Sequence, residues 1–470
     1  MTTAIVVGSG PNGLAAGATL ASAGVEVTVL EAAGAIGGGT RTGELTLPGL
    51  LHDHCSAFHP MAAGSPFLRG LDLASYGVTW RRAAIDLAHP LDGGRAAVLT
   101  RSLTETAAAL GPDGPAWQRL FGPLAGGFGE LAEEVMRPVP HVPAHPLRLA
   151  AFGTRALQPA TRIAGRWRTE EARALFAGCA AHGCYPLSRP ATAAIGLLLA
   201  AAGHRHGWPV AAGGSRAISD ALAKVIAGHG GRIETGVRVT SLASLPPADI
   251  VMLGVTPAAV VRLAGDRLPA RVRRAYLRYR HGPGAFKLDL AVEGGIPWRS
   301  PHCRQAAAVH VGGTLAEIAE AERAVHGGRM PGRPFVLVGQ QYLADPARSS
   351  GDIHPIWAYA HVPAGYPGDA TGAIVAQIER FAPGFRERIL ATARTGPAQW
   401  PACNPNYPGG DILTGANTPR QVLLRPRLTL SPYWTGIPGV YLCSAATPPG
   451  AGVHGMCGYH AARAALRHCG

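Results

Sequence analysis

The sequence predicts a two-domain α/β fold, and three observations support this prediction. The chain has 470 residues, more than one hydrophobic core usually serves. A strand, a glycine turn, a helix and a second strand follow one another over residues 5–31. Strand and glycine-loop patterns return at 205–265 and at 425–470, after long stretches of a different character. We therefore expect one sheet assembled from three separated stretches, with a second domain formed by the segments between them.

The domain boundaries follow from this alternation. We expect the first domain to comprise residues 1–85, 205–265 and 425–470, and the second to comprise 86–204 and 266–424. Residues 103–203 have a mostly helical pattern that prolines interrupt. Residues 270–420 combine strand patterns at 286–292, 335–339 and 356–361 with a helix at 315–325. The second domain is therefore expected to be a mixed sheet with helices.

The N-terminal unit carries a phosphate-binding pattern. Its turn reads Gly8, Gly10, Pro11, Asn12 and Gly13. The first glycine permits a tight turn, the second lets the backbone approach a pyrophosphate, and the third lets helix and strand pack closely. Glu31 ends the second strand, where a carboxylate can bind ribose hydroxyls and disfavours a 2′-phosphate. These features together predict a Rossmann-type dinucleotide site.

Two further glycine loops distinguish between dinucleotides. Residues 37–39 are three successive glycines, which let the chain pass flat against an extended cofactor, although a flexible turn is the alternative. Arg41 could then pair with a phosphate or with a surface carboxylate. Residues 450–455 repeat the G-x-G-x-x-G pattern before the last helix, without a second strand to complete a nicotinamide site. A helix N-terminus there would stabilise negative charge on a reduced flavin.

Several motifs carry a resemblance to a known group of proteins. They are Glu31 with residues 37–42, Leu47-Pro48-Gly49, Asp53-His54-Cys55-Ser56, Pro209 with Gly213-Gly214-Ser215, and residues 447–455. With them the chain resembles the phytoene desaturase and amine oxidase group of flavoproteins. Residues 282–289, 404–411 and 455–460 are similar to the phytoene dehydrogenase-like subfamily, which includes pyridine nucleotide-disulfide oxidoreductase domain-containing proteins. The absence of a C-x-x-C pair contradicts the disulfide label.

The resemblance implies a discontinuous (GR2-like) Rossmann-type FAD-binding domain. The residues that it assigns to FAD are Gly8, Gly10, Pro11, Asn12, Gly13, Glu31, Gly38, Gly39, Thr40, Arg41, Val239 on the adenine side, and Gly452, Val453 and His454 on the isoalloxazine side. The chain departs from the wider group at Gly39, where an arginine is common, so the resemblance leaves the role of Arg41 open.

Candidate catalytic residues follow from the chemistry of a flavin, which accepts a hydride at N5 while a base takes the accompanying proton. Lys287 and Asp289 lie on one face of the expected strand 286–292, so Lys287 could hold a water near N5. A structural pair on a solvated face is the alternative. His454 could act as a base or as a hydrogen-bond donor, or could simply cap the backbone. Tyr407 belongs to a polar loop that could reach the pocket.

The expected activity is dehydrogenation, or desaturation, of an apolar or amphipathic substrate, with oxygen or a quinone as the electron acceptor. The alternatives are oxidation of a carbon–nitrogen bond, a redox-neutral isomerisation or cyclisation, and a non-catalytic FAD-binding partner. No metal site is expected, because Cys179, His182 and Cys184 have no matching second pair.

Charge and hydropathy limit the partners. The net charge is +14, but the arginines are dispersed and no nucleic-acid-reading module is present, so nucleic acid is not an expected partner. Basic and aromatic residues combine at 147–168 and 271–280, which suits either an anionic membrane surface or a solvated face. The chain enters a strand pattern at once and its longest apolar run, 191–203, is too short to span a bilayer. We therefore expect a cytoplasmic protein, peripheral at the membrane in the first of these interpretations.

Overall fold

The computed structural model describes residues 2–469, with Cys469 described by its backbone alone. Its first sheet is wholly parallel, and its strands come from three separated parts of the chain. In spatial order they are β16 (Val440–Leu442), β10 (Ile250–Leu253), β1 (Thr3–Val7), β2 (Glu26–Leu30) and β9 (Arg232–Glu234). This is the Rossmann-like arrangement that the N-terminal pattern predicts.

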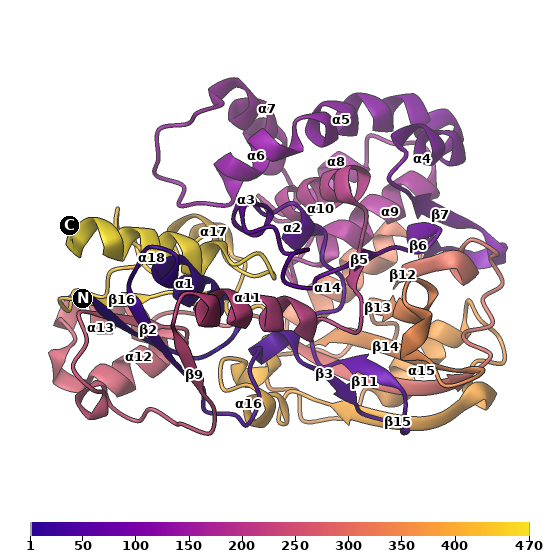
Figure 1. Cartoon of the computed structure of the whole chain (residues 1–470). Coiled ribbons are helices and arrows are strands. Elements are labelled where there is room, and N and C mark those ends of the chain that lie inside the picture. Colours follow the sequence, from indigo (N-terminus) through magenta and orange to yellow (C-terminus); the bar gives the residue numbers. More distant parts are fainter. Residues whose placement is uncertain (1, 470) are drawn as a thin grey trace.

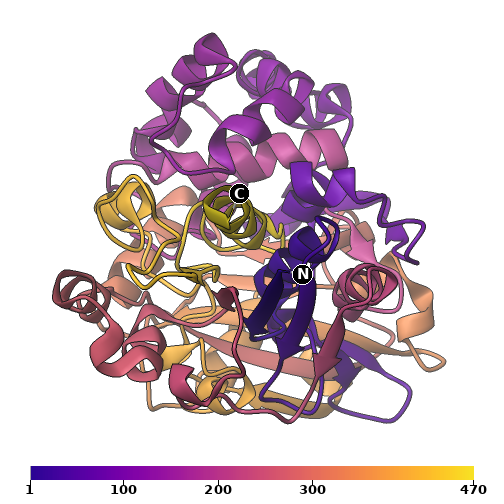
Figure 2. The same cartoon turned by 60° about the vertical axis from the view of Figure 1, so that its left-hand side comes forward.

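Helices cover both faces of this sheet because its strands alternate buried residues between two apolar clusters. Ala4 and Val6 of β1 pack into the cluster that contains α1 (Pro11–Ala21), α11 (Arg216–Gly228) and α18 (Met456–Cys469). Ile5 and Val7 pack on the opposite side, against α12 (Pro257–Ala264) and α13 (Ala270–Leu277). Both ends of the described chain lie side by side here, since α18 packs along α1 (Figures 1 and 2).

The second sheet is mixed and has seven strands. Its order is β15 (Ile389–Thr395), β11 (Gly284–Glu293), β14 (Ile353–Val362), β13 (Val336–Gly339), β12 (Ala306–Val311), β6 (Ile85–Pro90) and β7 (Ala96–Leu99). Neighbours are antiparallel except β12 and β6. One face packs with α15 (Thr371–Glu379) in a separate apolar cluster. The other face turns toward the helices and the first domain.

A helical layer lies over that inner face, and all of its helices except the last one named below lie in the upper part of Figures 1 and 2. It comprises α4 (Leu103–Ala109), α5 (Gly114–Gly126), α6 (Phe128–Val135), α7 (Pro146–Ala156), α8 (Ala160–Ala164), α9 (Glu170–Ala181), α10 (Ala193–His206) and α14 (Leu315–His326). A reciprocal capping box between Thr314 and Glu317 begins α14. The connecting elements are α2 (Pro60–Ala63), α3 (Pro66–Gly70), α16 (Trp400–Cys403), α17 (Pro419–Leu424) and the two-stranded pairs β3 (Thr42–Glu44) with β4 (Leu51–Asp53) and β5 (Trp80–Arg81) with β8 (Val210–Ala211).

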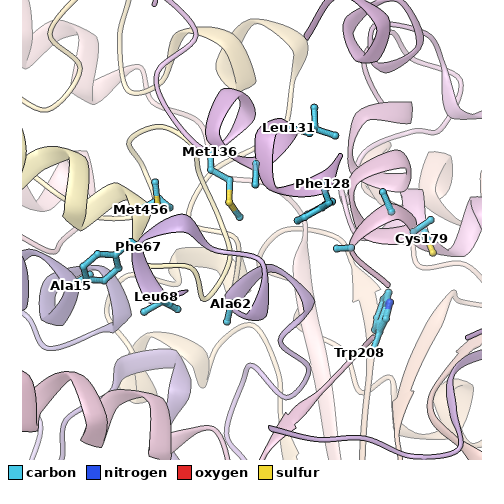
Figure 3. Close-up of a cluster of buried hydrophobic side chains, with 14 of the residues drawn as sticks. Ala15, Ala62, Phe67, Leu68, Phe128, Leu131, Met136, Cys179, Trp208 and Met456 are labelled. Atoms are coloured by element: carbon cyan, nitrogen blue, oxygen red, sulfur yellow. The ribbon is translucent and has the colours of Figure 1, made fainter. Parts of the chain in front are cut away.

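One apolar core joins the first domain to the helical layer. Figure 3 shows Ala15, Phe67 and Met456 on one side of this core and Phe128, Cys179 and Trp208 on the other. Such a shared core fixes the two parts relative to each other, because separating them would expose apolar surface to water. Within residues 2–469, no helix is long and apolar enough to cross a membrane.

Candidate functional site

The glycine turn after β1 has the geometry of a phosphate-binding loop. Gly8 has a φ of +96°, which an L side chain rarely adopts. A Cβ atom at Gly13 would lie 2.0 Å from the Gly8 carbonyl oxygen, so only glycine permits this helix–turn contact. A Cβ atom at Gly10, by contrast, would meet no atom within 4 Å. The first and third glycines are therefore required by the fold, whereas Gly10 leaves open space at the N-terminus of α1.

Glu31 stands beside this turn and organises it. Its carboxylate accepts hydrogen bonds from the Ser9 amide at 2.8 Å, the Ser9 hydroxyl at 2.6 Å and the Ala33 amide at 2.8 Å. The residue is only half-buried. A carboxylate held in this way keeps one orientation at the carboxyl edge of the parallel sheet, where ligands of such sheets bind.

The loop 37–42 folds over the glycine turn. The Gly37 amide donates to the Ser9 carbonyl at 3.0 Å, and a Cβ atom at Gly38 would lie 3.0 Å from the Gly10 Cα. The Arg41 guanidinium donates to the carbonyls of Gly38 at 3.0 Å and Cys403 at 2.5 Å, and within residues 2–469 it pairs with no carboxylate. Thr40 is buried and contacts the Ser219 hydroxyl. Through these two hydrogen bonds Arg41 fixes the loop in place.

Val239 follows β9 and is partly buried against the apolar cluster on the far face of the parallel sheet. The Val237 amide donates to the Glu31 carbonyl at 2.8 Å, which ties the segment before Val239 to the end of β2.

The C-terminal glycine loop reaches the same edge of the sheet through α18. A Cβ atom at Gly458 would lie 1.8 Å from the Asn12 carbonyl oxygen, so α18 and α1 pack backbone to backbone near their N-termini. Gly450 and Gly452, with φ of +114° and +129°, need glycine's freedom. Two helix N-termini, the positive ends of two helix dipoles, therefore converge on one place.

His454 is buried at the start of α18. Its Nδ1 accepts a hydrogen bond from the Met456 amide at 3.1 Å, and its carbonyl accepts one from the Ser65 hydroxyl at 2.7 Å. Burial lowers the pKa of His454 to about 4. The neutral imidazole thus caps the first turn of α18, which is the backbone-capping geometry, and it holds the loop that precedes it.

Lys287 and Asp289 form the pair that strand alternation predicts, but not on a solvated face. Both are nearly fully buried, their charged groups are in direct contact, and Asp289 lies 3.3 Å from the His52 ring. Across the sheet, Lys287 is in register with Tyr359 and Asp289 with Trp357. The solvated-face interpretation is wrong because both side chains are buried, with His52 of β4 against Asp289.

Tyr407 lies under the glycine loop. Its hydroxyl would be 2.3 Å from a Cβ atom at Gly39, and it interacts with the Cys55 thiol. Burial raises the pKa of Tyr407 well above 10, so the phenol stays protonated. Burial also lowers the pKa of His54 to about 4, with Arg41 and Lys287 adding to this effect. Lys287, Tyr407 and His54 are thus brought to one place from different segments.

Arg425 is a further candidate residue that no sequence pattern indicated. This arginine is buried, and its guanidinium would be 2.6 Å from a Cβ atom at Gly450. It donates to the Asn417 side chain at 2.8 Å and to the carbonyls of Ala445 and Gln421, and in the described part of the chain it donates to no carboxylate. Nothing in the sequence distinguishes it from the other members of a set of 43 basic residues. Among residues 2–469, no group of histidine, cysteine and acidic side chains could hold a metal ion.

Comparisons with known proteins agree with this geometry. The NAD(P)-binding Rossmann-like domain family matches residues 6–69. Pyridine nucleotide-disulfide oxidoreductase domain-containing protein 2 of Mus musculus is 36% identical over 91 residues, which span 19% of this chain and 16% of the mouse protein. The match therefore covers a small part of either protein.

Solved structures share the whole fold. An oxidoreductase from Methanosarcina mazei superposes with a TM-score of 0.64 and 16% identity, covering 99% of this chain and 100% of that one. Cyclohexylamine oxidase from Brevibacterium oxydans superposes with a TM-score of 0.58 and 18% identity, covering 100% and 99%. At these identities the likeness shows the fold: a Rossmann-like parallel-sheet domain with a second domain of mixed sheet and helices.

Proposed function

We propose that the chain is an FAD-dependent oxidoreductase of the phytoene dehydrogenase-like kind. The observation that carries the proposal is the convergence of two helix N-termini, α1 and α18, on the open space above Gly10. A dinucleotide pyrophosphate suits the first helix end, and an electron-rich ring suits the second. Because α18 packs on α1 at the same parallel sheet, one extended flavin dinucleotide can span this pair of helix ends.

The chain's own residues would each have a defined task. Glu31 would accept hydrogen bonds from ribose hydroxyls, and the amides of Gly10 to Gly13 would face the pyrophosphate. Bound FAD supplies a hydride acceptor. Lys287, held by Asp289, would orient a water at the reacting face. His454 would keep the α18 loop in place, and the helical layer would exclude water.

The substrate that this face favours is apolar or amphipathic. Trp357 and Tyr359 lie on the strand paired with that of Lys287, and Phe58 packs on Trp357. They offer apolar area and few charges, which supports carbon–carbon desaturation, with oxygen or a quinone as the acceptor.

Oxidation of a carbon–nitrogen bond is the second candidate. Trp357 and Tyr359 lie edge to face with ring centroids 5.0 Å apart, on the strand paired with Lys287. Aromatic rings so placed could bind an amine through cation–π attraction. The structural likeness to cyclohexylamine oxidase supports the same candidate.

Anaerobic titration of the purified protein separates these candidates. A panel of aliphatic amines and a panel of uncharged isoprenoid and acyl compounds are added while the flavin absorption is followed. Bleaching by the uncharged compounds alone supports desaturation, and bleaching by amines alone supports carbon–nitrogen oxidation. Bleaching by neither panel, with product isomers formed only after pre-reduction, would overturn both.

A membrane contact at the cytoplasmic face belongs to the same proposal. Val142, before α7, and Leu147, in its first turn, are 90% and 85% exposed, and α7 also carries Arg155 and Arg148, the latter paired with Glu130. Apolar and basic residues on one exposed segment suit an anionic bilayer. Co-sedimentation with vesicles containing phosphatidylserine, lost in Leu147→Ser and at high salt, tests this contact.

A further inference from the structure

A cysteine, a histidine and a glutamate come together away from the glycine loops. Cys184 follows the C-terminus of α9, His361 lies on β14 and Glu322 on α14. The Cys184 sulfur is 3.3 Å from Nε2 of His361, and Nδ1 of the same ring is 2.6 Å from the Glu322 carboxylate. A thiol, an imidazole and a carboxylate thus stand in the order of nucleophile, base and orienting group.

Cys184 is more exposed than the other two residues. His361 and Glu322 are each 1% exposed, whereas Cys184 keeps part of its surface. Cys184 also has a φ of +48°, at a helix end where glycine or asparagine is the usual residue. A side chain that carries a Cβ atom is disfavoured there, so packing alone does not explain a cysteine at this position.

His361 differs from the other imidazoles of this cluster in its affinity for a proton. Burial disfavours a charged ring, but Cys184 and Glu322 outweigh it and raise the pKa of His361 well above 6.5. The nearby imidazoles do the opposite, since burial lowers the pKa of His182 to about 3 and that of His89 to about 4, and places the pKa of His310 well below 6.5. Burial raises the pKa of the Cys184 thiol, Glu322 and Asp411 act in the same direction, and His361 opposes them. His361 is therefore the ring in this cluster that takes a proton from a neighbour.

Tyr359 completes the site. Its ring lies 5.7 Å from that of His361, one alternation along β14. Burial, reinforced by Cys184 and Cys55, raises its pKa well above 10, so the hydroxyl remains a donor. That hydroxyl makes no hydrogen bond to another residue in the described part of the chain. It is available to a carbonyl oxygen of a ligand.

We propose that Cys184, with His361 and Glu322, is a nucleophilic thiol site that takes conjugated carbonyl compounds. A carbon–sulfur bond forms at the β-carbon, and the carbon–carbon π pair shifts toward the carbonyl, whose oxygen accepts from Tyr359. The thiol proton passes to His361 and then to the α-carbon, so no electrons are gained or lost. Glu322 is a positioning residue. The reaction needs no redox cofactor, so a test of this thiol site does not depend on the proposed function.

The test is alkylation of the purified full-length protein, as isolated, with iodoacetamide and with 2-cyclohexen-1-one. Peptide mass spectrometry measures the rate at each cysteine from pH 5 to 10. The exposed Cys403 is the internal reference. At pH 7 we expect Cys184 to react about tenfold faster than Cys403, because His361, 3.3 Å from the sulfur, takes the thiol proton as the carbon–sulfur bond forms. The comparison variants are Glu322→Gln, His361→Asn and, as a matched control on the exposed face of α14, Glu320→Gln.

Glu322→Gln is expected to remove this advantage, because the His361 ring loses the carboxylate that orients it, and the melting temperature is checked in parallel. Glu320→Gln is expected to leave both unchanged. The proposal is overturned if Cys184 in the native protein reacts no faster than Cys403. It is also overturned if a folded Glu322→Gln protein keeps the wild-type rate.

Discussion

At the scale of single residues, the three glycines of the N-terminal turn have different tasks that sequence alone does not separate. Gly13 is required by the Gly8 carbonyl, whereas Gly10 borders open space. A Gly10→Ala protein should therefore fold and melt like the wild type but bind FAD at least about tenfold more weakly, a loss of roughly 1.4 kcal/mol. Thermal melting and FAD titration of the apoprotein measure the two properties.

Gly13→Ala should behave differently, with a free energy of unfolding about 1–3 kcal/mol lower, since its Cβ atom must displace backbone. Gly34→Ala, at an exposed glycine with no atom near its Cβ position, is the control and should change neither property. Equal FAD affinity of Gly10→Ala and wild type would contradict our assignment of the space above Gly10.

The Lys287–Asp289 pair gives a second residue-scale prediction. Lys287→Met leaves the Asp289 carboxylate buried without its partner, so unfolding should become easier by about 3–5 kcal/mol. The double variant Lys287→Met with Asp289→Leu removes both charges and should recover most of that loss. Urea unfolding followed by circular dichroism measures both.

If the pair is purely structural, the stable double variant reduces its flavin at the wild-type rate. We expect instead that it is slowed while FAD content stays the same, because the water-holding group is gone. The double variant therefore separates the contribution of the pair to stability from its contribution to flavin reduction.

At the scale of elements, the sequence predicts each strand of the parallel sheet from its apolar run and flanking glycine. It does not predict that α18 lies against α1, because that contact depends on Gly458 meeting a backbone carbonyl more than four hundred residues away. The Lys287–Asp289 face was likewise predicted by alternation, whereas its burial depends on segments distant in the sequence, such as β4 with His52. Residue patterns report local periodicity, and the covering layer is a tertiary property.

Gly458→Ala tests the helix contact. Its Cβ atom would lie 1.8 Å from the Asn12 carbonyl, so α18 must shift away from α1 and the C-terminal loop with it. We expect a lower melting temperature and loss of bound flavin. Gly153→Ala, in α7 with no atom near its Cβ position, should be neutral or stabilising by up to about 1 kcal/mol. A flavin-replete Gly458→Ala protein would show that the contact is dispensable.

At the scale of the whole molecule, buried neutral histidines set the response to acid. Burial lowers the pKa to about 4 in each of His59, His89, His204, His206, His454 and His460. The folded state therefore binds fewer protons than the unfolded state between pH 6.5 and 4. The stability that these rings contribute is fully present above about pH 6.5 and is lost as the pH falls toward 4.

We accordingly expect the melting temperature to fall steadily from pH 6.5 downward, well above the range in which carboxylates titrate. His361 opposes this trend, because its pKa is raised and its pairing is favoured at low pH. Differential scanning calorimetry in a pH series measures the curve. A melting temperature that is constant between pH 7 and 4.5 would contradict the burial of these rings as neutral groups.

At this scale the proposed function depends on one ligand that contacts the N-termini of both α1 and α18. The most direct measurement is the visible spectrum of the purified protein, with the released cofactor identified and quantified after denaturation. We predict flavin absorption bands and about one FAD per chain, bound directly or after reconstitution of the apoprotein. A colourless protein that takes up no FAD, or that binds NAD(P) in its place, would contradict the account and leave only the fold.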